Sequence, residues 1–304
     1  MNRLKSIVVG FDFSRCAASA VAQAIRIARR NHADLTVVHA VDPLVVHDLA
    51  RANAMSVAET TSDTIASATH ALVQAVKAID PDIEFETHVE VSSSIRVLVS
   101  VVKSTRADLL VLGVYGVSGP GRGAGTLATK CVRKAPVRVL LVHERHESAY
   151  RRIVACIDFS ETSEAAAAQA ARIAAADKAE LFLLHVFHGP WHRLHYRAPS
   201  SESSPDFQRQ YTAALTAQLD SLREPLARQT PDLSMTTAVV DHVSHGDAII
   251  EFATANDADL IVLGTEGRTM LRYMILGSTA ERVLRELTSS VLVIKPKSLM
   301  LTEE

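Results

Sequence analysis

Residues 260–278 read LIVLGTEGRTMLRYMILGS, in which an apolar run ends at Gly264 and glycine returns at Gly267 and Gly277. The first four residues form a short, unbroken apolar run, which is typical of a strand buried on both faces of a parallel sheet. Ligands of such sheets bind beyond the carboxyl ends of the strands. Gly264 and Gly267 allow the loop a positive φ and bring backbone N–H groups close to an anion. We therefore interpret this stretch as a cradle for the phosphates of a nucleotide.

A helix is expected directly after Gly277 and Ser278, because Val283, Leu284 and Leu287 recur at helical spacing. The free N–H groups and the positive dipole end at its start would face the same anion, contributing roughly 0.3–1 kcal/mol. The hydroxyl of Ser278 can add a hydrogen bond. The alternative is a strand-to-helix connection with a serine cap and no ligand. Because glycine spacing is a weak signal by itself, the sequence leaves both interpretations open.

The chain contains the same pattern twice, which indicates a duplicated domain. Three blocks return: IVVGFDFS (7–14) as IVACIDFS (153–160), ADLTVVHAV (33–41) as AELFLLHVF (179–187), and ADLLVLGVYG (107–116) as ADLIVLGTEG (258–267). The length of 304 residues suits two domains of about 150 residues each. We predict one domain over residues 1–147 and a second over residues 148–304.

Each copy alternates short apolar strands with amphipathic helices, which predicts a doubly wound α/β domain with a parallel sheet. In the first copy, strands are expected at residues 6–10, 35–41, 83–89, 109–112 and 137–142. Ser14 is expected to cap the first helix, and one long helical segment is expected from Pro43 to about Ile79. Shorter helices are expected from about Ile95 and over residues 126–134. In the second copy, Ser244 and Asp247 fit a capping box ahead of a helix at residues 248–255.

The composition is that of an ordinary soluble protein, with 48% apolar and 22% charged residues. A net charge of −2 argues against nucleic acid as the main partner. Cys16, Cys131 and Cys156 form no CxxC pattern and are interpreted as reduced thiols. No apolar run is long enough for a membrane span, and no signal peptide is recognised. We therefore expect a cytoplasmic protein with no membrane or nucleic-acid partner.

The segment from His188 to Asp206 is rich in proline and serine and is expected to form a mobile loop. It contains His188, His192 and His195, which raises the question of a metal site. No cysteine lies nearby, and histidine in such a loop needs no metal, so we expect no metal site. A lid over a nearby ligand and a solvated excursion are the two interpretations left open.

Three of these features together resemble the universal stress protein family: the first strand ending in Asp-Phe-Ser, the Leu-His-Val of the second strand, and Gly-x2-Gly-x9-Gly-Ser before the last helix. The resemblance covers nearly the whole chain, twice. The glycine pattern is similar to that of the ATP-binding branch, whereas the other blocks also occur in members that bind no nucleotide. The resemblance implies Rossmann-like domains of the adenine nucleotide alpha hydrolase-like type, each with a five-stranded sheet of order 3-2-1-4-5. It also implies ATP, with Mg²⁺, as the ligand.

Carried onto the second copy, the resemblance implies that Asp158 contacts the ribose or adenine and that the backbone of Val186 meets the adenine. A carboxylate accepts hydrogen bonds from ribose hydroxyls. Asp158 has an alternative role, which is to cap the turn into the next helix together with Ser160. Arg268 can pair with a phosphate or stay exposed without a partner. The positions implied around the phosphates are Leu263, Gly264, Gly267, Arg268, Gly277, Ser278 and Thr279.

The first copy departs from this pattern, because eight residues instead of nine separate Gly116 from Gly125. The missing residue shortens the span by up to ~3.5 Å, enough to disturb simultaneous phosphate contacts. Gly119, Gly121 and Gly123 give this loop freedom to adapt, and nucleotide binding is expected to be weaker here than in the second copy. The corresponding positions are Asp12, Ala40, Gly113, Gly116, Gly125 and Thr126.

Catalytic motifs are incomplete in this sequence. No Gly-Lys-Ser/Thr triplet of a Walker loop occurs, and Pro120 replaces the last glycine of a nucleophile elbow that would begin at Gly116. We therefore expect an ATP-binding regulatory module of the stress response and not an enzyme, with the nucleotide in the second domain. A nucleotide-free interaction scaffold and a slow ATPase are the alternatives. Expected partners are an adenine nucleotide and an unidentified protein, and the two copies are expected to pair through their last strands, with a homodimer as a further option.

Overall fold

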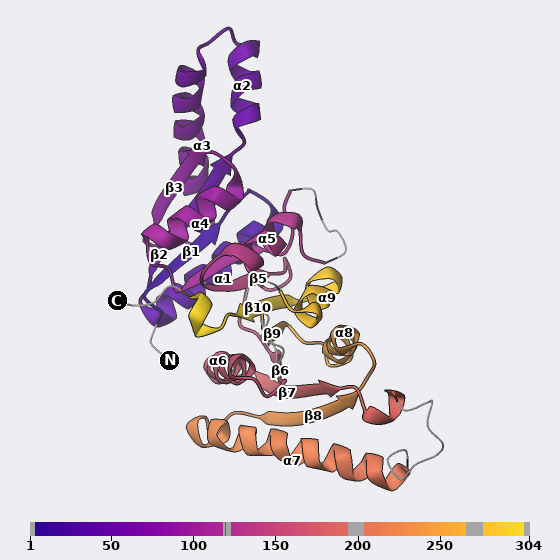
Figure 1. Ribbon diagram of the computed structural model, residues 1–304. Coiled ribbons are helices and arrows are strands. Elements are labelled where there is room, and N and C mark those ends of the chain that lie inside the picture. Colours follow the sequence, from indigo (N-terminus) through magenta and orange to yellow (C-terminus); the bar gives the residue numbers. More distant parts are fainter. Residues whose placement is uncertain (1–3, 118, 120–122, 194–203, 266–275, 301–304) are drawn as a thin grey trace. The chain divides into compact units, whose positions relative to one another are not determined.

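The computed structural model describes residues 4–117, 119, 123–193, 204–265 and 276–300. The chain forms two compact units. The N-terminal unit runs to Ser148 and also includes the residues from Lys297 on, and the C-terminal unit spans Ala149–Pro296. In both units strands alternate with helices (Figure 1), as the sequence predicts.

Five parallel strands form the sheet of the N-terminal unit. They are β1 (Ser6–Gly10), β2 (Asp34–Val41), β3 (Glu86–Val91), β4 (Leu109–Gly113) and β5 (Arg138–Val142). Their order is β3-β2-β1-β4-β5, which confirms the predicted order 3-2-1-4-5. The central strand β1 is apolar and fully buried at Ile7, Val8 and Val9, because helices cover both faces of the sheet.

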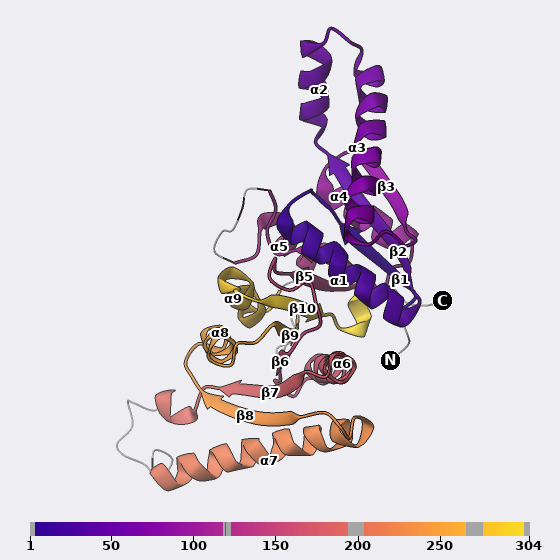
Figure 2. The same ribbon diagram turned by 180° about the vertical axis from the view of Figure 1, so that it is seen from behind.

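The helices of this unit are α1 (Arg15–Asn31), α2 (Pro43–Ala52), α3 (Val57–Ile79), α4 (Ser94–Ser104) and α5 (Thr126–Lys134), and a 3-10 turn, η3, covers Lys297–Leu299. Helices α1 and α3 pack on one face of the sheet, and α4 and α5 pack on the other (Figures 1 and 2). The predicted cap of α1 is confirmed, since the Ser14 hydroxyl accepts a hydrogen bond from the N–H of Ala17 at 3.1 Å.

The single long helix predicted from Pro43 to Ile79 is wrong, because the chain breaks into α2 and α3 at residues 53–56. Ala54 takes a left-handed conformation with φ of 52°, and Ser56 begins α3 through a capping box with Glu59. Helix α2 and the first turns of α3 form a helical hairpin that projects beyond the sheet (Figures 1 and 2). We call residues 43–63 the arm.

Strand β3 begins later than predicted, at Glu86 instead of residue 83. Pairing with β2 sets this limit, since Thr36 pairs with Glu86 and Val41 pairs with Val91. Ile83 is a buried apolar residue, but it lies outside the strand.

The C-terminal unit repeats the plan. Its strands are β6 (Arg152–Cys156), β7 (Glu180–Phe187), β8 (Met235–Asp241), β9 (Leu260–Gly264) and β10 (Ser290–Ile294), all parallel, in the order β8-β7-β6-β9-β10. The helices are α6 (Glu161–Asp177), α7 (Pro205–Gln229), α8 (His245–Ala255) and α9 (Ser278–Glu286), with a 3-10 turn, η1, at Pro190–Arg193. Strand β9 is fully buried at Leu260, Ile261 and Val262, as its apolar run predicts.

Candidate functional site

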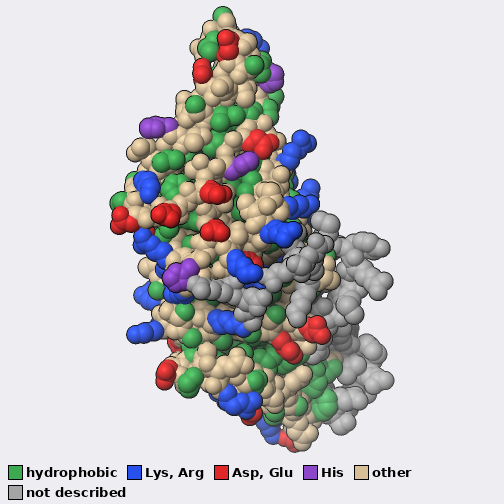
Figure 3. Space-filling model, turned by 90° about the vertical axis from the view of Figure 1, so that its left-hand side faces the viewer, with side chains coloured by type: hydrophobic (Ala, Val, Ile, Leu, Met, Phe, Trp, Pro, Cys, Tyr) green, Lys and Arg blue, Asp and Glu red, His purple; other side chains and the backbone are tan. Residues whose placement is uncertain are grey.

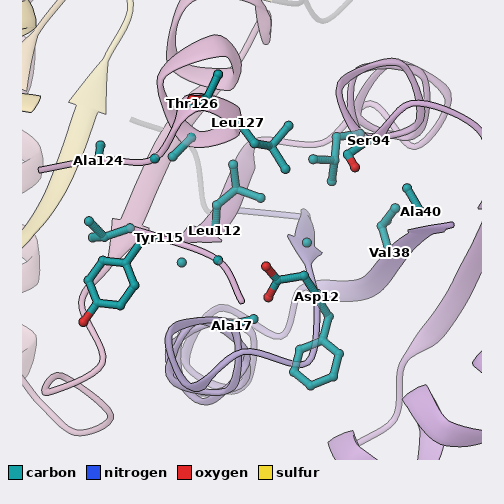
Figure 4. Close-up of a pocket in the computed structure, with 18 of the residues that line it drawn as sticks. Asp12, Ala17, Val38, Ala40, Ser94, Leu112, Tyr115, Ala124, Thr126 and Leu127 are labelled. Carbon is teal, nitrogen blue, oxygen red and sulfur yellow. The ribbon is translucent and has the colours of Figure 1, made fainter. Parts of the chain in front are cut away.

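A cavity of about 460 Å³ opens in the N-terminal unit beyond the carboxyl ends of β1, β2 and β4 (Figure 4). Small-molecule sites typically have volumes of roughly 300–1,000 Å³, so this cavity is large enough for a nucleotide-sized ligand. All six positions predicted in the first copy line it: Asp12, Ala40, Gly113, Gly116, Gly125 and Thr126. The fold therefore brings together side chains that lie more than one hundred residues apart in the sequence.

Asp12 lies two residues after the end of β1 and is the one acidic residue among the described residues that line this cavity. One carboxylate oxygen accepts a hydrogen bond from the N–H of Ser14 at 3.1 Å. The carboxylate points into the cavity toward Leu112 (Figure 4). A Cβ placed on Gly116 would lie only 2.5 Å from the second oxygen, Oδ2. Glycine at position 116 thus leaves the room that the Asp12 carboxylate occupies.

Gly113 and Gly125, at the two ends of this loop, differ in what a side chain there would contact. A Cβ on Gly113 would lie 2.7 Å from the Cβ and 2.9 Å from the backbone carbon of Cys16, so glycine lets the end of β4 pack against the start of α1. A Cβ on Gly125 would meet the carbonyl oxygen of Val114 at 3.5 Å, an ordinary contact. The N–H of Gly125 donates to that same oxygen at 2.7 Å, which fixes the start of α5.

Two helices begin at this cavity without a side-chain cap. Gly125 precedes α5 and Ser93 precedes α4, and neither makes a capping hydrogen bond through a side chain. Thr126 and Ser94, the first residues of these helices, line the cavity. The first N–H groups of a helix lack partners within the helix and carry its positive dipole end. The cavity therefore favours a negatively charged ligand at the end opposite Asp12.

Tyr115 lies in the glycine loop, but its hydroxyl points away from the cavity (Figure 4). Its ring packs edge-on against His143, with 5.8 Å between the ring centroids. Burial raises the pKa of Tyr115, and its interactions with Glu144 and Cys16 raise that pKa further. Tyr115 therefore stays protonated and anchors the loop instead of serving as an acid or base.

The corresponding cavity of the C-terminal unit has a volume of about 180 Å³ in the described part of the chain. Seven predicted positions line it: Asp158, Val186, Leu263, Gly264, Gly277, Ser278 and Thr279. The predicted Gly267 and Arg268 lie outside the described residues. The described members of the predicted set thus meet in one place.

The turn-capping alternative for Asp158 is confirmed. Its Oδ1 accepts hydrogen bonds from the N–H of Ser160 at 3.0 Å and from the Ser160 hydroxyl at 2.6 Å. Ser278 is the first residue of α9, Gly277 is the cap position, and no side chain caps the helix. The alternative of a serine cap at Ser278 is therefore wrong, and Ser278 is one of the residues that line the cavity.

Helix α8 differs in charge from its counterpart α4. The Ser244 hydroxyl accepts from the N–H of Asp247 at 3.4 Å, so half of the predicted capping box is present. The Asp247 carboxylate instead accepts from Arg282 Nε at 2.6 Å. The Arg282 and Ser244 hydrogen bonds lower the pKa of Asp247. The start of α8 is capped by Ser244 and its acid is neutralised by Arg282, whereas the start of α4 has no side-chain cap and carries Arg96 at the equivalent position. The start of α4 therefore attracts an anion more strongly.

Both units contain a histidine contact that sequence reasoning missed. His39 Nδ1 lies 2.7 Å from the carbonyl oxygen of Phe11, and His185 Nδ1 lies 2.7 Å from that of Ile157. Because a carbonyl only accepts, Nδ1 carries the proton in both rings. A phenylalanine with positive φ packs against each ring, Phe13 at 63° and its counterpart at 60°. The signal was the histidine at the same place in both copies of the second strand.

The histidine-containing segment is ordered at its start. Residues 190–193 form η1, which corrects the expectation of a loop there, and α7 begins at Pro205. His192 Nε2 lies 2.9 Å from Asp241 Oδ2, and the N–H of Gly189 donates to Asp241 Oδ1 at 3.0 Å. His195 lies outside the described residues, and among those that are described no three metal-ligating side chains gather.

Comparison with known proteins identifies the family. A model of the universal stress protein family matches residues 3–143 and again residues 149–295. The chain belongs to the universal stress protein family. A universal stress protein of Mycolicibacterium smegmatis is 28% identical over 302 residues, covering 96% of this chain and 97% of the relative. One of Mycobacterium tuberculosis is 26% identical over 308 residues, covering 97% of both chains.

Solved structures share the fold of this tandem universal stress protein. A protein of unknown function from Pseudomonas aeruginosa aligns with a TM-score of 0.64 at 18% identity, covering 97% of this chain and 94% of its own. A universal stress protein from Archaeoglobus fulgidus aligns with a TM-score of 0.59 at 15% identity, covering 95% and 98%. The predicted family and its tandem arrangement are therefore confirmed. Of the helices that the structure describes, none is both apolar enough and long enough to span a membrane.

Proposed function

We propose that this universal stress protein is a regulatory protein that binds ATP, and that the N-terminal cavity is the stronger of its two sites. One observation carries the proposal: the 460 Å³ cavity has a carboxylate at one end and two uncapped helix starts at the other. A nucleotide has the matching polarity, since ribose hydroxyls donate hydrogen bonds and phosphates are anions.

The residues that line the cavity suit the three parts of the nucleotide. Asp12 would accept from the ribose hydroxyls, and the backbone of Ala40, beside the apolar Val38 and Leu112, would meet the base. The N–H groups at the start of α5, with the Thr126 hydroxyl, would hold the phosphates. Mg²⁺ is held in such sites mainly by phosphate oxygens and water, so it would enter with the triphosphate.

The C-terminal cavity is proposed as the weaker site. Its described walls enclose about 180 Å³, and one of its two facing helix starts carries the Asp247–Arg282 pair. The glycine spacing predicted this unit as the preferred one, and residues 266–275 of that glycine loop are outside the described residues. Titration of the variants Gly116→Ala and Gly277→Val with MgATP tests which of the two cavities binds ATP more tightly.

We further propose that binding occurs without efficient turnover. The ionisable side chains that line the N-terminal cavity, within the described part of the chain, are Asp12, His39 and Tyr115. Phosphoryl transfer requires cationic groups that stabilise the charge of the transition state, and the sequence has no Gly-Lys-Ser/Thr triplet that would supply the lysine of a Walker loop. A nucleotide-free scaffold and a slow ATPase stay as the alternatives, and pairing of the two domains through their last strands stays a prediction.

Calorimetric titration with MgATP tests the proposal on three proteins: the wild type, Gly116→Ala and Gly277→Val. We expect Gly116→Ala to weaken the binding of MgATP and Gly277→Val to leave it intact. Loss of binding with Gly277→Val alone would move the site to the C-terminal unit. No binding in the wild type would favour a scaffold, and phosphate release above a buffer control would favour an ATPase.

A further inference from the structure

Five of the nine large apolar side chains that are exposed in the described part of the chain lie in the arm. Its large apolar side chains are exposed at Leu44 (70%), Val45 (50%), Leu49 (41%), Met55 (39%) and Val57 (43%). Figure 3 shows hydrophobic side chains at the surface of the arm, which is the projection at the top of the view. Exposed apolar patches of this kind mark interaction sites in soluble proteins.

Helix α2 has two different faces. Val46 and Ala50 are buried, and α2 packs against α3. With 3.6 residues per turn, the opposite face carries Leu44, Val45 and Asp48. Arg51 lies beside them, one turn after Asp48, and its NH2 is 3.2 Å from Asp48 Oδ1. The outward face therefore combines apolar side chains with one exposed acid and one exposed base.

This arrangement of charges is complementary to itself. When a second α2 runs antiparallel about a two-fold axis between positions 49 and 50, Asp48 lies opposite Arg51 of the second copy, and the same contact occurs twice. We propose that the arm binds the arm of a second copy of this chain through the outward face of α2.

The contact is small, and this sets its strength. Helix α2 has ten residues and is therefore about 15 Å long. Stable interfaces bury about 800 Å² on each partner, which is more than one short helix provides. The association is accordingly weak and depends on protein concentration. Apolar contact supplies most of the affinity, and the two exposed ion pairs fix the direction and register.

Sedimentation velocity over a concentration series tests the proposal with charge-swap variants. The single variants Asp48→Arg and Arg51→Asp each bring like charges together and should raise the dimer dissociation constant on the order of tenfold. The double variant Asp48→Arg/Arg51→Asp restores opposite charges and should restore the wild-type constant. Val243→Ser is the matched control, because this valine is 69% exposed on the C-terminal unit.

Circular dichroism of each variant confirms that α2 is intact, as expected for exposed positions. Weakening by both single variants, rescue by the double variant and no effect of the control would support the arm contact. A wild-type chain that stays monomeric throughout the series overturns the proposal and points to a different protein as occupant. A dimer that is indifferent to the single charge variants, or one that the double variant does not rescue, overturns it as well.

Discussion

The substitution Gly116→Ala separates ligand binding from folding in the N-terminal unit. The added Cβ would lie 2.5 Å from Asp12 Oδ2, whereas ordinary contacts of a Cβ begin at 3.4 Å. The carboxylate must therefore retreat by about 0.9 Å. Because that oxygen is the end of a side chain that can rotate, the backbone need not move.

The expected magnitude follows from the bonds that the displaced carboxylate loses. A hydrogen bond to a charged group contributes about 1.5–3 kcal/mol, so losing the bond to a ribose hydroxyl should weaken nucleotide binding about 10- to 100-fold. The cap of α1 comes from the Ser14 hydroxyl and not from Asp12. The free energy of unfolding should therefore change by less than about 1 kcal/mol.

Two neighbouring glycines supply matched controls. In Gly125→Ala the new Cβ meets the nearest protein atom at 3.5 Å, so the folded protein has room for it and large destabilisation is not expected. In Gly113→Ala the Cβ would lie 2.9 Å from a backbone atom of Cys16, and the variant should lose about 1–3 kcal/mol of stability. Calorimetric titration with MgATP gives the affinities, and urea denaturation gives the stabilities. Equal affinity of the wild type and Gly116→Ala would refute the reasoning.

Three further expectations concern other parts of the chain. The pKa of Cys156 is raised to about 12, mainly because its thiol is buried and also because the Asp158 carboxylate lies nearby. Alkylation at pH 8, read out by mass spectrometry, should therefore leave Cys156 unmodified until the chain unfolds. Gln23→Leu removes side-chain donors to the carbonyl oxygens of residues 146 and 148 and should cost about 2–4 kcal/mol in urea denaturation; an unchanged midpoint would contradict this. Burial alone would raise the pKa of Asp241, but its hydrogen bonds to Gly189 and His192 lower it overall. The wild type should therefore be more stable than Asp241→Asn at neutral pH. This difference in the free energy of unfolding should vanish as the pH falls below about 3.9, the ordinary pKa of aspartate, and then through the lower pKa of Asp241 in the folded protein. Trp191 fluorescence reports the unfolding.

Much of the fold follows from local patterns in the sequence. Buried apolar runs such as residues 260–263 mark the strands, and the family resemblance implied their order. The break between α2 and α3 was missed although Ser56 and Glu59 carry the signal of a capping box, because the apolar pattern continues across it. The start of β3 was missed because pairing with β2 decides it, and a partner strand is not visible in a local pattern.

The sequence predicts which residues gather at the edge of each sheet, whereas the ranking of the two cavities as nucleotide sites stays a proposal. Residues that follow parallel strands meet at one edge of the sheet, so the six positions predicted in the first copy come together, as do the seven described positions of the second. The spacing of glycines favoured the second copy. Spacing does not reveal that Gly116 leaves room for the Asp12 carboxylate, or that Arg282 takes the Asp247 carboxylate away from the start of α8. These are contacts between segments far apart in the chain.

A crystal structure of the full chain grown with MgATP tests the central claim most directly. The account predicts nucleotide in the N-terminal cavity, with the ribose against Asp12 and the phosphates at the start of α5. An empty N-terminal cavity, with ATP bound only beside Gly277 and Ser278 or not bound at all, would contradict it.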